Sequence, residues 1–328
     1  MAVTVKDVAR EAGVSPSTVS RVVNGDSRIS ARTRNKVLAC MKELGYQVNN
    51  IARSLKTNKT MTVGFISPEL SNDVFMNIAK GAEDEFRKHG YNIIICNSNE
   101  SIEEEKDRIN LLSQKCVDGI IIIPASAEGE HYSWLRAADL PVVLVDRLVE
   151  HFETDAVLVD NINGSYSAVE YLINNGLRRI GFIGGDMRLT SAGERYEGYR
   201  RALADYCVPL EEGIVRFGDY HVNSGYRIMS ELMEAAEPPE YVFISNYYMH
   251  IGAMKYLLEH RTLTENKAFI AAFDDLEFSG ILGLSGVRIA QPMLEIGSRA
   301  AQLLLSRING EQLPFPQIVR LKTCLKIG

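Results

Sequence analysis

Long apolar runs and clustered cysteines are both missing from this 328-residue sequence. No stretch of about 18 uncharged apolar residues occurs, and no apolar signal segment follows the charged N-terminus, so we expect a soluble cytoplasmic protein without a membrane partner. The five cysteines are odd in number and form no C-x-x-C pair, which argues against disulfides and zinc sites. We expect reduced thiols that lie mostly in the core: Cys40, Cys96, Cys116, Cys207 and Cys324.

Signature motifs of catalysis are missing as well. The sequence contains no Gly-x-Ser-x-Gly elbow, no phosphate-binding P-loop, no Gly-x-Gly-x-x-Gly turn and no His-Glu-x-x-His helix. Its six histidines are dispersed. We therefore expect no metal, no cofactor and no catalytic residues.

Charge is plentiful but uneven along the chain. Residues 1–60 carry eleven Lys/Arg and four Asp/Glu, a net charge of +7, whereas the whole chain carries −6, which leaves −13 for the remainder. A basic module joined to an acidic body is typical of a polyphosphate-binding domain on a soluble carrier. A merely solvated basic tail is the alternative, and the apolar pattern of this segment argues against it.

The first 46 residues have the pattern of three short helices that share one small core. Apolar side chains recur at helical spacing from Val5 to Ala12, from Pro16 to Val23 and from Ala31 to Leu44. Each segment has an N-cap before it and a glycine stop after it: Thr4, Ser15 and Ser30, then Gly13, Gly25 and Gly45. About four residues separate the first two helices, which is the helix-turn-helix connection, and the polar face of the second suits a DNA major groove.

The segment from Thr4 to Gly25 allows a more specific interpretation. It reads Thr-Val-Lys-Asp-Val-Ala-Arg-Glu-Ala-Gly-Val-Ser-Pro-Ser-Thr-Val-Ser-Arg-Val-Val-Asn-Gly and resembles the signature of the LacI/GalR (lactose-repressor/galactose-repressor) family of bacterial regulators. The resemblance continues through Ser30-Ala-Arg-Thr-Arg34 and Leu44-Gly-Tyr46. It implies that residues 1–46 are a DNA-binding headpiece.

The resemblance also assigns roles within the second helix. It implies that Pro16 and Ser17 contact bases, with Arg21 as the third reader. Because proline is a poor donor, we expect Arg21 to carry much of the readout through a bidentate contact with guanine, worth about 1–3 kcal/mol of discrimination. A surface ion pair of Arg21 with Glu11 or Asp26 is the alternative. The other expected DNA contacts of the headpiece, mainly to phosphates, are Thr4, Ser15, Thr18, Ser20, Asn24, Arg28 and Arg32.

Residues 47–60 form the expected hinge. Asn49 can cap a helix of seven or eight residues, which is too short to be stable alone in water. The resemblance implies that this helix folds when two copies pair over the minor groove, where Leu55 wedges between base pairs and Ala52 lies beside it. Val48 stands where the family commonly has proline. Ordinary linker hydrophobics at Ile51 and Leu55 are the alternative.

From residue 61 onward, short apolar runs alternate with amphipathic stretches, which predicts an α/β fold with parallel, doubly wound sheets. The expected strands include Met61–Ser67, Asn92–Cys96, Gly119–Ile123, Val142–Asp146, Ile180–Gly184, Tyr241–Ser245, Phe269–Phe273 and Ile318–Leu321. The expected helices include Ile78–His89, Glu103–Gln114, Tyr199–Tyr206, Gly225–Glu234, Ile251–His260 and Leu294–Asn309. The length predicts two lobes, and the resemblance implies a fold like that of periplasmic sugar-binding proteins. We place the first lobe at about 61–160 plus 292–320 and the second at about 161–291 plus 321–328, with crossings near Asp160, near Gln291 and near the end of the chain.

Polar residues at strand ends are candidates for a ligand cleft between the lobes. We select residues that also match family ligand positions, together with one aromatic wall: Phe75, Asp146, Arg147, Arg195, Tyr220, Asn246 and Asp274. Carboxylates, arginines and an aromatic suit a hydroxyl-rich effector. Strand-end caps or salt bridges between the lobes are the alternative roles. Tyr247-Tyr248 stands where the family often has an aspartate, which favours a bulkier or more apolar ligand.

These features predict a sequence-specific DNA-binding transcription regulator, a repressor, that binds a pseudo-palindromic double-stranded operator as a homodimer. Its effector is expected to be a sugar or sugar derivative. We expect a dimer rather than a tetramer because no leucine heptads follow Ile318–Leu321. A helix-turn-helix fused to a sugar-metabolising enzyme is the alternative, and a protein co-effector is left open.

Overall fold

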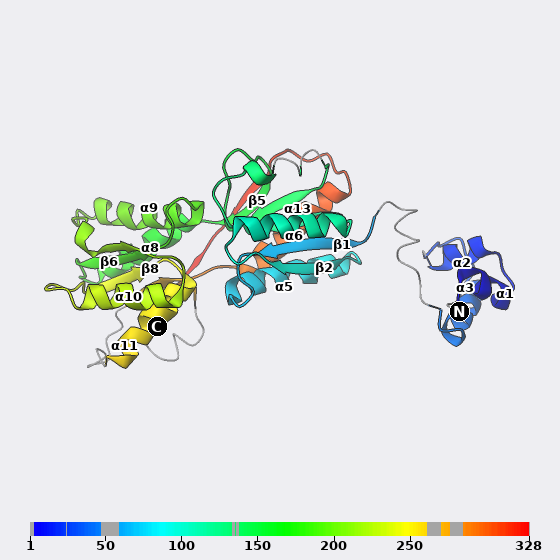
Figure 1. The fold of residues 1–328 in the computed structure, drawn as a ribbon, viewed down its shortest axis with the longest axis horizontal. Helices are drawn as coiled ribbons and strands as arrows, with labels where there is room; N and C mark the ends of the chain where they lie inside the picture. The colour runs from blue at the N-terminus through cyan, green and yellow to red at the C-terminus, as the bar shows by residue number, and fades with distance from the viewer. Residues whose placement is uncertain are drawn as a thin grey trace. The chain divides into compact units, whose positions relative to one another are not determined.

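The structure is a computed structural model in which the chain forms two compact units, Met1–Thr60 and Met61–Gly328 (Figure 1). It describes residues 3–23, 25–46, 59–132, 135, 138–260, 270–275 and 285–327. None of the described helices has the length and apolar character needed to cross a bilayer.

The headpiece contains three short helices, α1 (Val5–Ala12), α2 (Pro16–Val23) and α3 (Ala31–Glu43). Gly13 ends α1 in the left-handed conformation, with a φ of 62°, which a side chain would disfavour. The three helices share one apolar core: Val8, Ala9, Ala12, Val19, Val22, Val37 and Cys40. The predicted helix-turn-helix arrangement is confirmed.

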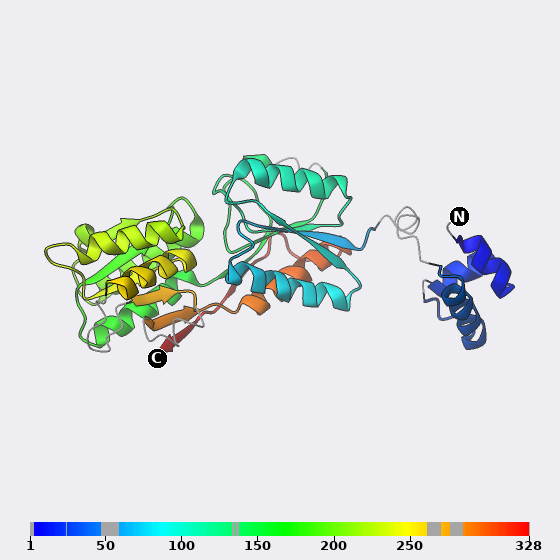
Figure 2. The ribbon, with the colours of Figure 1, turned by 60° about the horizontal axis from the view of Figure 1, so that its bottom comes forward.

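The first lobe of the larger unit is built on a six-stranded sheet in which all pairings are parallel. In the order of the sheet, its strands are β11 (Ile318–Leu321), β5 (Asp155–Val159), β4 (Val142–Val145), β3 (Ile120–Ile122), β1 (Thr62–Ser67) and β2 (Asn92–Asn97). Helix α6 (Ile102–Gln114) covers one face, and α5 (Asp73–Lys88) and α13 (Met293–Ile308) cover the other (Figure 2). The central strands are buried along nearly their whole length, because helices exclude water from both faces.

The second lobe repeats this design. Its sheet runs β12 (Cys324–Ile327), β10 (Ser285–Ala290), β9 (Ile270–Phe273), β8 (Tyr241–Ile244), β6 (Ile180–Gly184) and β7 (Val215–Phe217), and only the β10–β12 pair is antiparallel. Helices α8 (Asn161–Asn174) and α9 (Thr190–Asp205) lie on one face, and α10 (Val222–Met233) and α11 (Tyr247–Glu259) lie on the other (Figure 1). The predicted α/β class with two lobes is confirmed.

The chain passes between the two sheets three times. It leaves the first sheet after Val159, returns after Ala290 and leaves again after Leu321. Each lobe is therefore discontinuous in sequence. The carboxyl ends of β4 and β9, one from each sheet, supply side chains to a single cavity described below.

The cysteine prediction is wrong in part. Cys40 and Cys96 are buried, but Cys116, Cys207 and Cys324 are exposed, and none of the five is paired in a disulfide. Cys116 and Cys207 lie in turns that follow helices, with φ of 54° and 53°, and Cys324 lies on the outermost strand of its sheet. These are surface positions that a count of cysteines does not reveal.

Candidate functional site

The polar face of α2 presents the predicted base readers to solvent. Pro16, Ser17 and Arg21 are all exposed. The Ser15 hydroxyl lies 2.7 Å from the Ser17 hydroxyl and accepts a hydrogen bond from the Thr18 backbone N–H at 3.1 Å, so the start of α2 is held by its own side chains. Within the described part of the headpiece, Arg21 forms no ion pair with Glu11 or Asp26, so this alternative is not seen. Its role in base readout stays a prediction.

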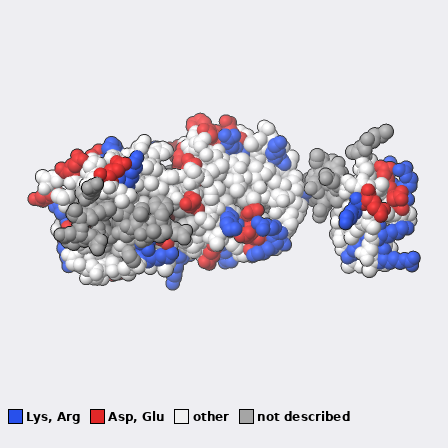
Figure 3. All heavy atoms as spheres, turned by 90° about the horizontal axis from the view of Figure 1, so that it is seen from below, with Lys and Arg blue, Asp and Glu red and all other residues white. Residues whose placement is uncertain are grey.

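Two other DNA-contact candidates are engaged inside the headpiece. Arg28 donates to the Asp26 carboxylate from Nε at 2.9 Å and from Nη2 at 2.8 Å. These hydrogen bonds hold the pKa of Asp26 well below its usual range, with a smaller contribution from the Arg21 charge. Thr4 donates its backbone N–H to the Asp7 carboxylate at 3.0 Å and its hydroxyl to the same oxygen at 2.7 Å, so these two residues form a capping box at the start of α1. Figure 3 shows Lys and Arg side chains on the visible face of the headpiece.

The predictions for Asn24, Asn49, Ala52 and Leu55 lie outside the described residues. Ser20 and Arg32 lie on α2 and α3, and Ser20 is half-buried. The assignment of phosphate contacts therefore stays a prediction throughout the headpiece.

All seven predicted ligand residues line one cavity of the larger unit: Phe75, Asp146, Arg147, Arg195, Tyr220, Asn246 and Asp274. They come from separate segments of both lobes. This inner cavity has a volume of only about 20 Å³. The lining side chains approach one another closely and fill most of this space.

Strand ends place three of these side chains. Asp146 directly follows β4 and Asp274 directly follows β9, and both have left-handed backbones with φ of 68° and 79°. Tyr220 follows β7 and has a φ of 67°. Residues other than glycine rarely adopt this conformation, and they do so mainly where surrounding structure compensates the strain, often at functional sites.

Arg195 occupies the centre of the inner cavity. It is 7% exposed, its Nε donates to Asn161 Oδ1 at 2.9 Å, and its Nη1 donates to the Ser245 carbonyl at 2.8 Å. Its Nη2 lies 3.6 Å from Asp146 Oδ1, and its guanidinium stacks 3.8 Å above the centre of the Phe273 ring. A bridge between lobes, the alternative that we left open, is therefore present in this conformation.

Asp274 is the second buried carboxylate of the cavity. It accepts a hydrogen bond from Gln291 Nε2 at 2.5 Å. Burial raises the pKa of Asp274, against opposing effects of Arg195 and Gln291. Asp275 points elsewhere, since it pairs with Arg288 at 2.8 Å and with Lys326 at 2.6 Å.

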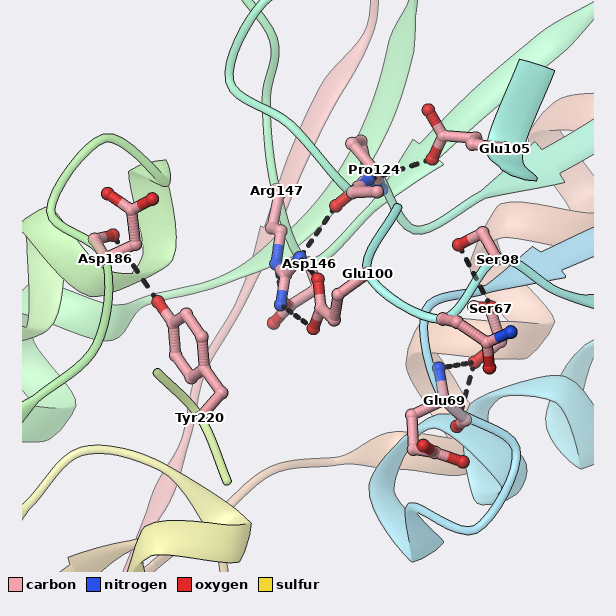
Figure 4. Close-up of polar contacts among 12 residues, drawn as sticks. Ser67, Glu69, Ser98, Glu100, Glu105, Pro124, Asp146, Arg147, Asp186 and Tyr220 are labelled. Atoms are coloured by element: carbon pink, nitrogen blue, oxygen red, sulfur yellow. Dashed lines mark hydrogen bonds and ion pairs between the residues drawn. The ribbon is translucent and has the colours of Figure 1, made fainter. Parts of the chain in front are cut away.

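Arg147 is held by a residue that the sequence did not reveal. Glu100 accepts two hydrogen bonds from the Arg147 guanidinium, at 2.9 and 3.1 Å, and the Pro124 carbonyl accepts a third at 2.7 Å (Figure 4). Arg147 is only 4% exposed, and its Nε lies 3.5 Å from Asp146 Oδ2 without a hydrogen bond. Asp146 therefore lies between the guanidinium groups of Arg147 and Arg195.

Two tyrosines that depart from the family pattern connect the lobes. The Tyr247 hydroxyl donates to Asp73 Oδ2 at 2.9 Å, and the Tyr248 hydroxyl lies 2.9 Å from Ser71 Oγ. Asn246, beside them, both lines the cavity and caps α11, because its Oδ1 accepts from the Met249 N–H. The lobes are thus joined directly at the start of α11.

A larger chamber of about 690 Å³ adjoins the inner cavity, and Tyr220 lines both. Its size matches a small-molecule site, whereas the inner cavity holds the predicted residues. Within the described residues, the inner cavity brings together buried carboxylates and guanidinium groups from both lobes, Asp146, Arg147, Arg195 and Asp274. Burial raises the pKa of Tyr220 to about 12, so its hydroxyl stays protonated and donates toward the Asp186 carbonyl at 3.4 Å. Among the described residues, no group of three or more His, Cys, Asp or Glu is placed to hold a metal ion.

Comparison with protein families decides the classification. A model of "Periplasmic binding proteins and sugar binding domain of LacI family" matches residues 60–315, and a model of "Bacterial regulatory proteins, lacI family" matches residues 4–49. The chain belongs to the LacI family. Its curated LacI-family relatives include the HTH-type transcriptional regulator RegA of Clostridium saccharobutylicum, which is 34% identical over 97% of this chain and 96% of RegA.

Solved LacI-family structures are similar over the same regions. The lac repressor dimer bound to operator and the anti-inducer ONPF has a TM-score of 0.85 and 25% identity, and the match covers 100% of this chain and 98% of that one. A LacI-family regulator from Enterococcus faecium with bound ribose has a TM-score of 0.71 and 26% identity, over 81% of this chain and 96% of that one. The chain is thus a LacI-family transcription regulator, and its relatives are regulators rather than enzymes.

Several cavity residues of this LacI-family chain were missed. Glu100, Asn161 and Gln291 all contact predicted arginines or aspartates. Gln291 and Asn161 lie at crossings between the lobes, which place side chains at the cleft. Glu100 follows β2, and extending the strand-end criterion by three residues beyond Asn97 identifies it.

Proposed function

We propose that this chain is a transcriptional repressor. Its affinity for a pseudo-palindromic operator is controlled by a hydroxyl-rich effector that binds between the lobes. One observation carries the proposal: seven residues chosen from the sequence line a single cavity to which both lobes contribute. Two carboxylates and two guanidinium groups there offer both acceptors and donors to sugar hydroxyls.

Access to the cavity requires movement. A cavity of about 20 Å³ has no room for a sugar, so the inner side chains must exchange contacts with one another for contacts with the ligand. The hydrogen bonds of Tyr247 and Tyr248 between lobes must break or adjust as the cleft opens. An effector that binds one lobe arrangement better than another shifts the population toward it.

Two copies of the chain supply the operator contacts. One three-helix headpiece offers few base contacts, and a two-fold dimer reads two half-sites. Movement of the lobes changes the spacing of the two hinge segments, and Leu55 acts there as the minor-groove wedge. The lac repressor match is a dimer on operator, which supports this assembly.

The test begins with selection of binding sites from random duplexes by the full-length protein. We expect a pseudo-palindromic consensus, and a chain that lacks residues 1–60 should select none. Fluorescence anisotropy on that duplex, repeated with ribose, cellobiose and glucose, then measures the effector response. Equal selection by the chain without residues 1–60 would falsify the assignment of DNA binding to the headpiece.

A purely regulatory role also excludes turnover. We expect each sugar that alters operator affinity to be recovered unchanged after prolonged incubation with the protein. Product formation at a rate proportional to protein concentration supports the fused-enzyme alternative instead.

A further inference from the structure

The ion pair between Glu100 and Arg147 lies where the two cavities meet. Glu100 lines the outer chamber and is 31% exposed, whereas Arg147 lines the inner cavity and is buried. Both guanidinium Nη atoms of Arg147 donate to Glu100. Arginine binds the carboxylate and phosphate groups of ligands through the same kind of bidentate contact. Here the chain supplies the anion itself.

The backbone holds Glu100 in this position. Asn99 and Glu100 are consecutive left-handed residues, with φ of 51° and 52°. The Glu100 N–H donates to the Pro68 carbonyl at 3.1 Å, and Ser98 donates its N–H to the Ser67 carbonyl at 2.8 Å, so the turn is tied to the end of β1 (Figure 4). A turn with two successive strained residues persists only where the surrounding contacts hold it in place.

The charge of the outer chamber also disfavours anionic ligands. Its charged lining residues are Glu100, Glu103, Glu128, Asp186, Asp219 and Arg188. Arg188, the one cation among the described residues of the lining, is already paired with Asp186 at 2.6 Å. An anionic ligand therefore approaches through a chamber of negative charge and meets an arginine that is already occupied.

We propose that Glu100 is a specificity residue that occupies Arg147 and thereby excludes phosphorylated and carboxylated ligands, so that the cleft admits uncharged polyols. This inference rests on the proposed function, because it assigns the chemical class of the effector of the same site. It is separable from that function, since it predicts a gain of anion binding in a variant.

The decisive experiment is calorimetry on the full-length protein with inorganic phosphate and glucose 6-phosphate. Glu100→Gln removes the charge and leaves one neutral acceptor where Arg147 had two charged ones, so both anions should bind at least about tenfold more tightly than to the wild type. Glu103→Gln is the matched control, because it removes the same charge from the same chamber without contacting Arg147.

Each outcome decides the question. A gain in Glu100→Gln that is absent in Glu103→Gln supports the proposal, and an equal gain in both, or none in either, overturns it. If Glu100→Gln melts below the assay temperature, Glu100→Asp replaces it: its shorter carboxylate should give an intermediate gain, and phosphate affinity equal to that of the wild type overturns the proposal. Ribose, cellobiose and glucose are titrated in parallel. If none of these sugars binds the wild type, the proposed sugar effector is contradicted, but the predicted gain of anion affinity in Glu100→Gln is not.

Discussion

The headpiece and the larger unit place their functional side chains in opposite environments. On α2, Pro16, Ser17 and Arg21 are exposed on a helix whose other face is the core. In the larger unit, Arg147 and Arg195 are 4% and 7% exposed and are bound to several partners each. Changing an exposed reader should alter binding alone, whereas changing a buried ligand residue should alter stability as well.

The largest expected effect tests the buried side of this comparison. Arg195→Ala removes one of the two guanidinium groups beside Asp146 and the donor to Asn161 Oδ1, and it empties the space above Phe273. Because breaking a buried ion pair typically costs about 3–5 kcal/mol, the free energy of unfolding of the larger unit should fall by that amount in urea titrations. Arg200→Ala, on the same helix but 52% exposed, is the control and should change it by less than about 0.5 kcal/mol. Equal losses would contradict a special role for the buried arginine.

Arg21→Ala tests the exposed side. It should weaken binding to the selected operator by about 1–3 kcal/mol, or roughly 5- to 150-fold, because a bidentate base contact is lost. The melting temperature and the affinity for effector should not change. Anisotropy with operator and with a scrambled duplex separates the roles: a proportionate loss on both duplexes identifies Arg21 as a phosphate contact.

The headpiece and the larger unit also differ in how well the sequence predicts them. The headpiece helices were predicted because each has an apolar stripe, a cap and a glycine stop close together in sequence. The predicted helices around the cleft begin late: α5 from Ile78, α9 from Tyr199 and α11 from Ile251, whereas the observed helices begin at Asp73, Thr190 and Tyr247. The first turn of α5 supplies Val74 and Phe75 to the cavity, and that of α9 supplies Ser191 and Ala192, so these turns face the cleft.

Helix α8 shows why local patterns fail here. Helix α8 opens with Asn161-Ile-Asn-Gly-Ser165, a sequence with little helical character, yet Asn161, Gly164 and Ser165 are buried. Their places are set by contacts with distant residues, such as the bond from Arg195 to Asn161. In the same way, the pairing of Glu100 with Arg147 joins residues 47 positions apart, which no motif records. Asp146, Arg147, Tyr220, Asn246 and Asp274 were found because strand ends and the family resemblance both pointed to them, whereas Arg195 lies within α9 and Phe75 within α5.

A smaller effect is expected where the lobes are joined at the surface of the cleft. Replacing both Tyr247 and Tyr248 with Phe removes two hydrogen bonds between lobes while keeping both rings. Each bond contributes about 0.5–1.5 kcal/mol, so the closed arrangement should lose stability and the ligand-free protein should show a larger radius of gyration in X-ray scattering. Tyr226→Phe, whose hydroxyl bonds to Glu259 within one lobe, should leave the radius unchanged. No difference between the two variants would show that the tyrosines do not hold the lobes together.

The smallest effect concerns pH. Burial raises the pKa of Asp274 in the folded state above its ordinary value of 3.8, so in the window above 3.8 the native state binds more protons than the unfolded state. The contribution of this carboxyl to stability is therefore greatest at low pH and declines as pH rises through that window. Comparison with Asp274→Asn isolates it: the unfolding free energy of wild type minus that of the variant should decrease as pH increases. A difference that increases with pH would contradict burial as the dominant cause.

The strand order of the two sheets has a consequence for synthesis on the ribosome. The headpiece core is complete in sequence once α3 has emerged, but the first sheet lacks β11 until residues 318–321 are made, and the second lacks β12 until residues 324–327 follow. Strand β5 therefore remains an open edge while residues 160–317 are made, and β10 remains one until β12 follows, so that each can pair with other nascent chains in that interval. A ribosome that stalls before codon 318 leaves a folded DNA-binding module attached to two unfinished sheets.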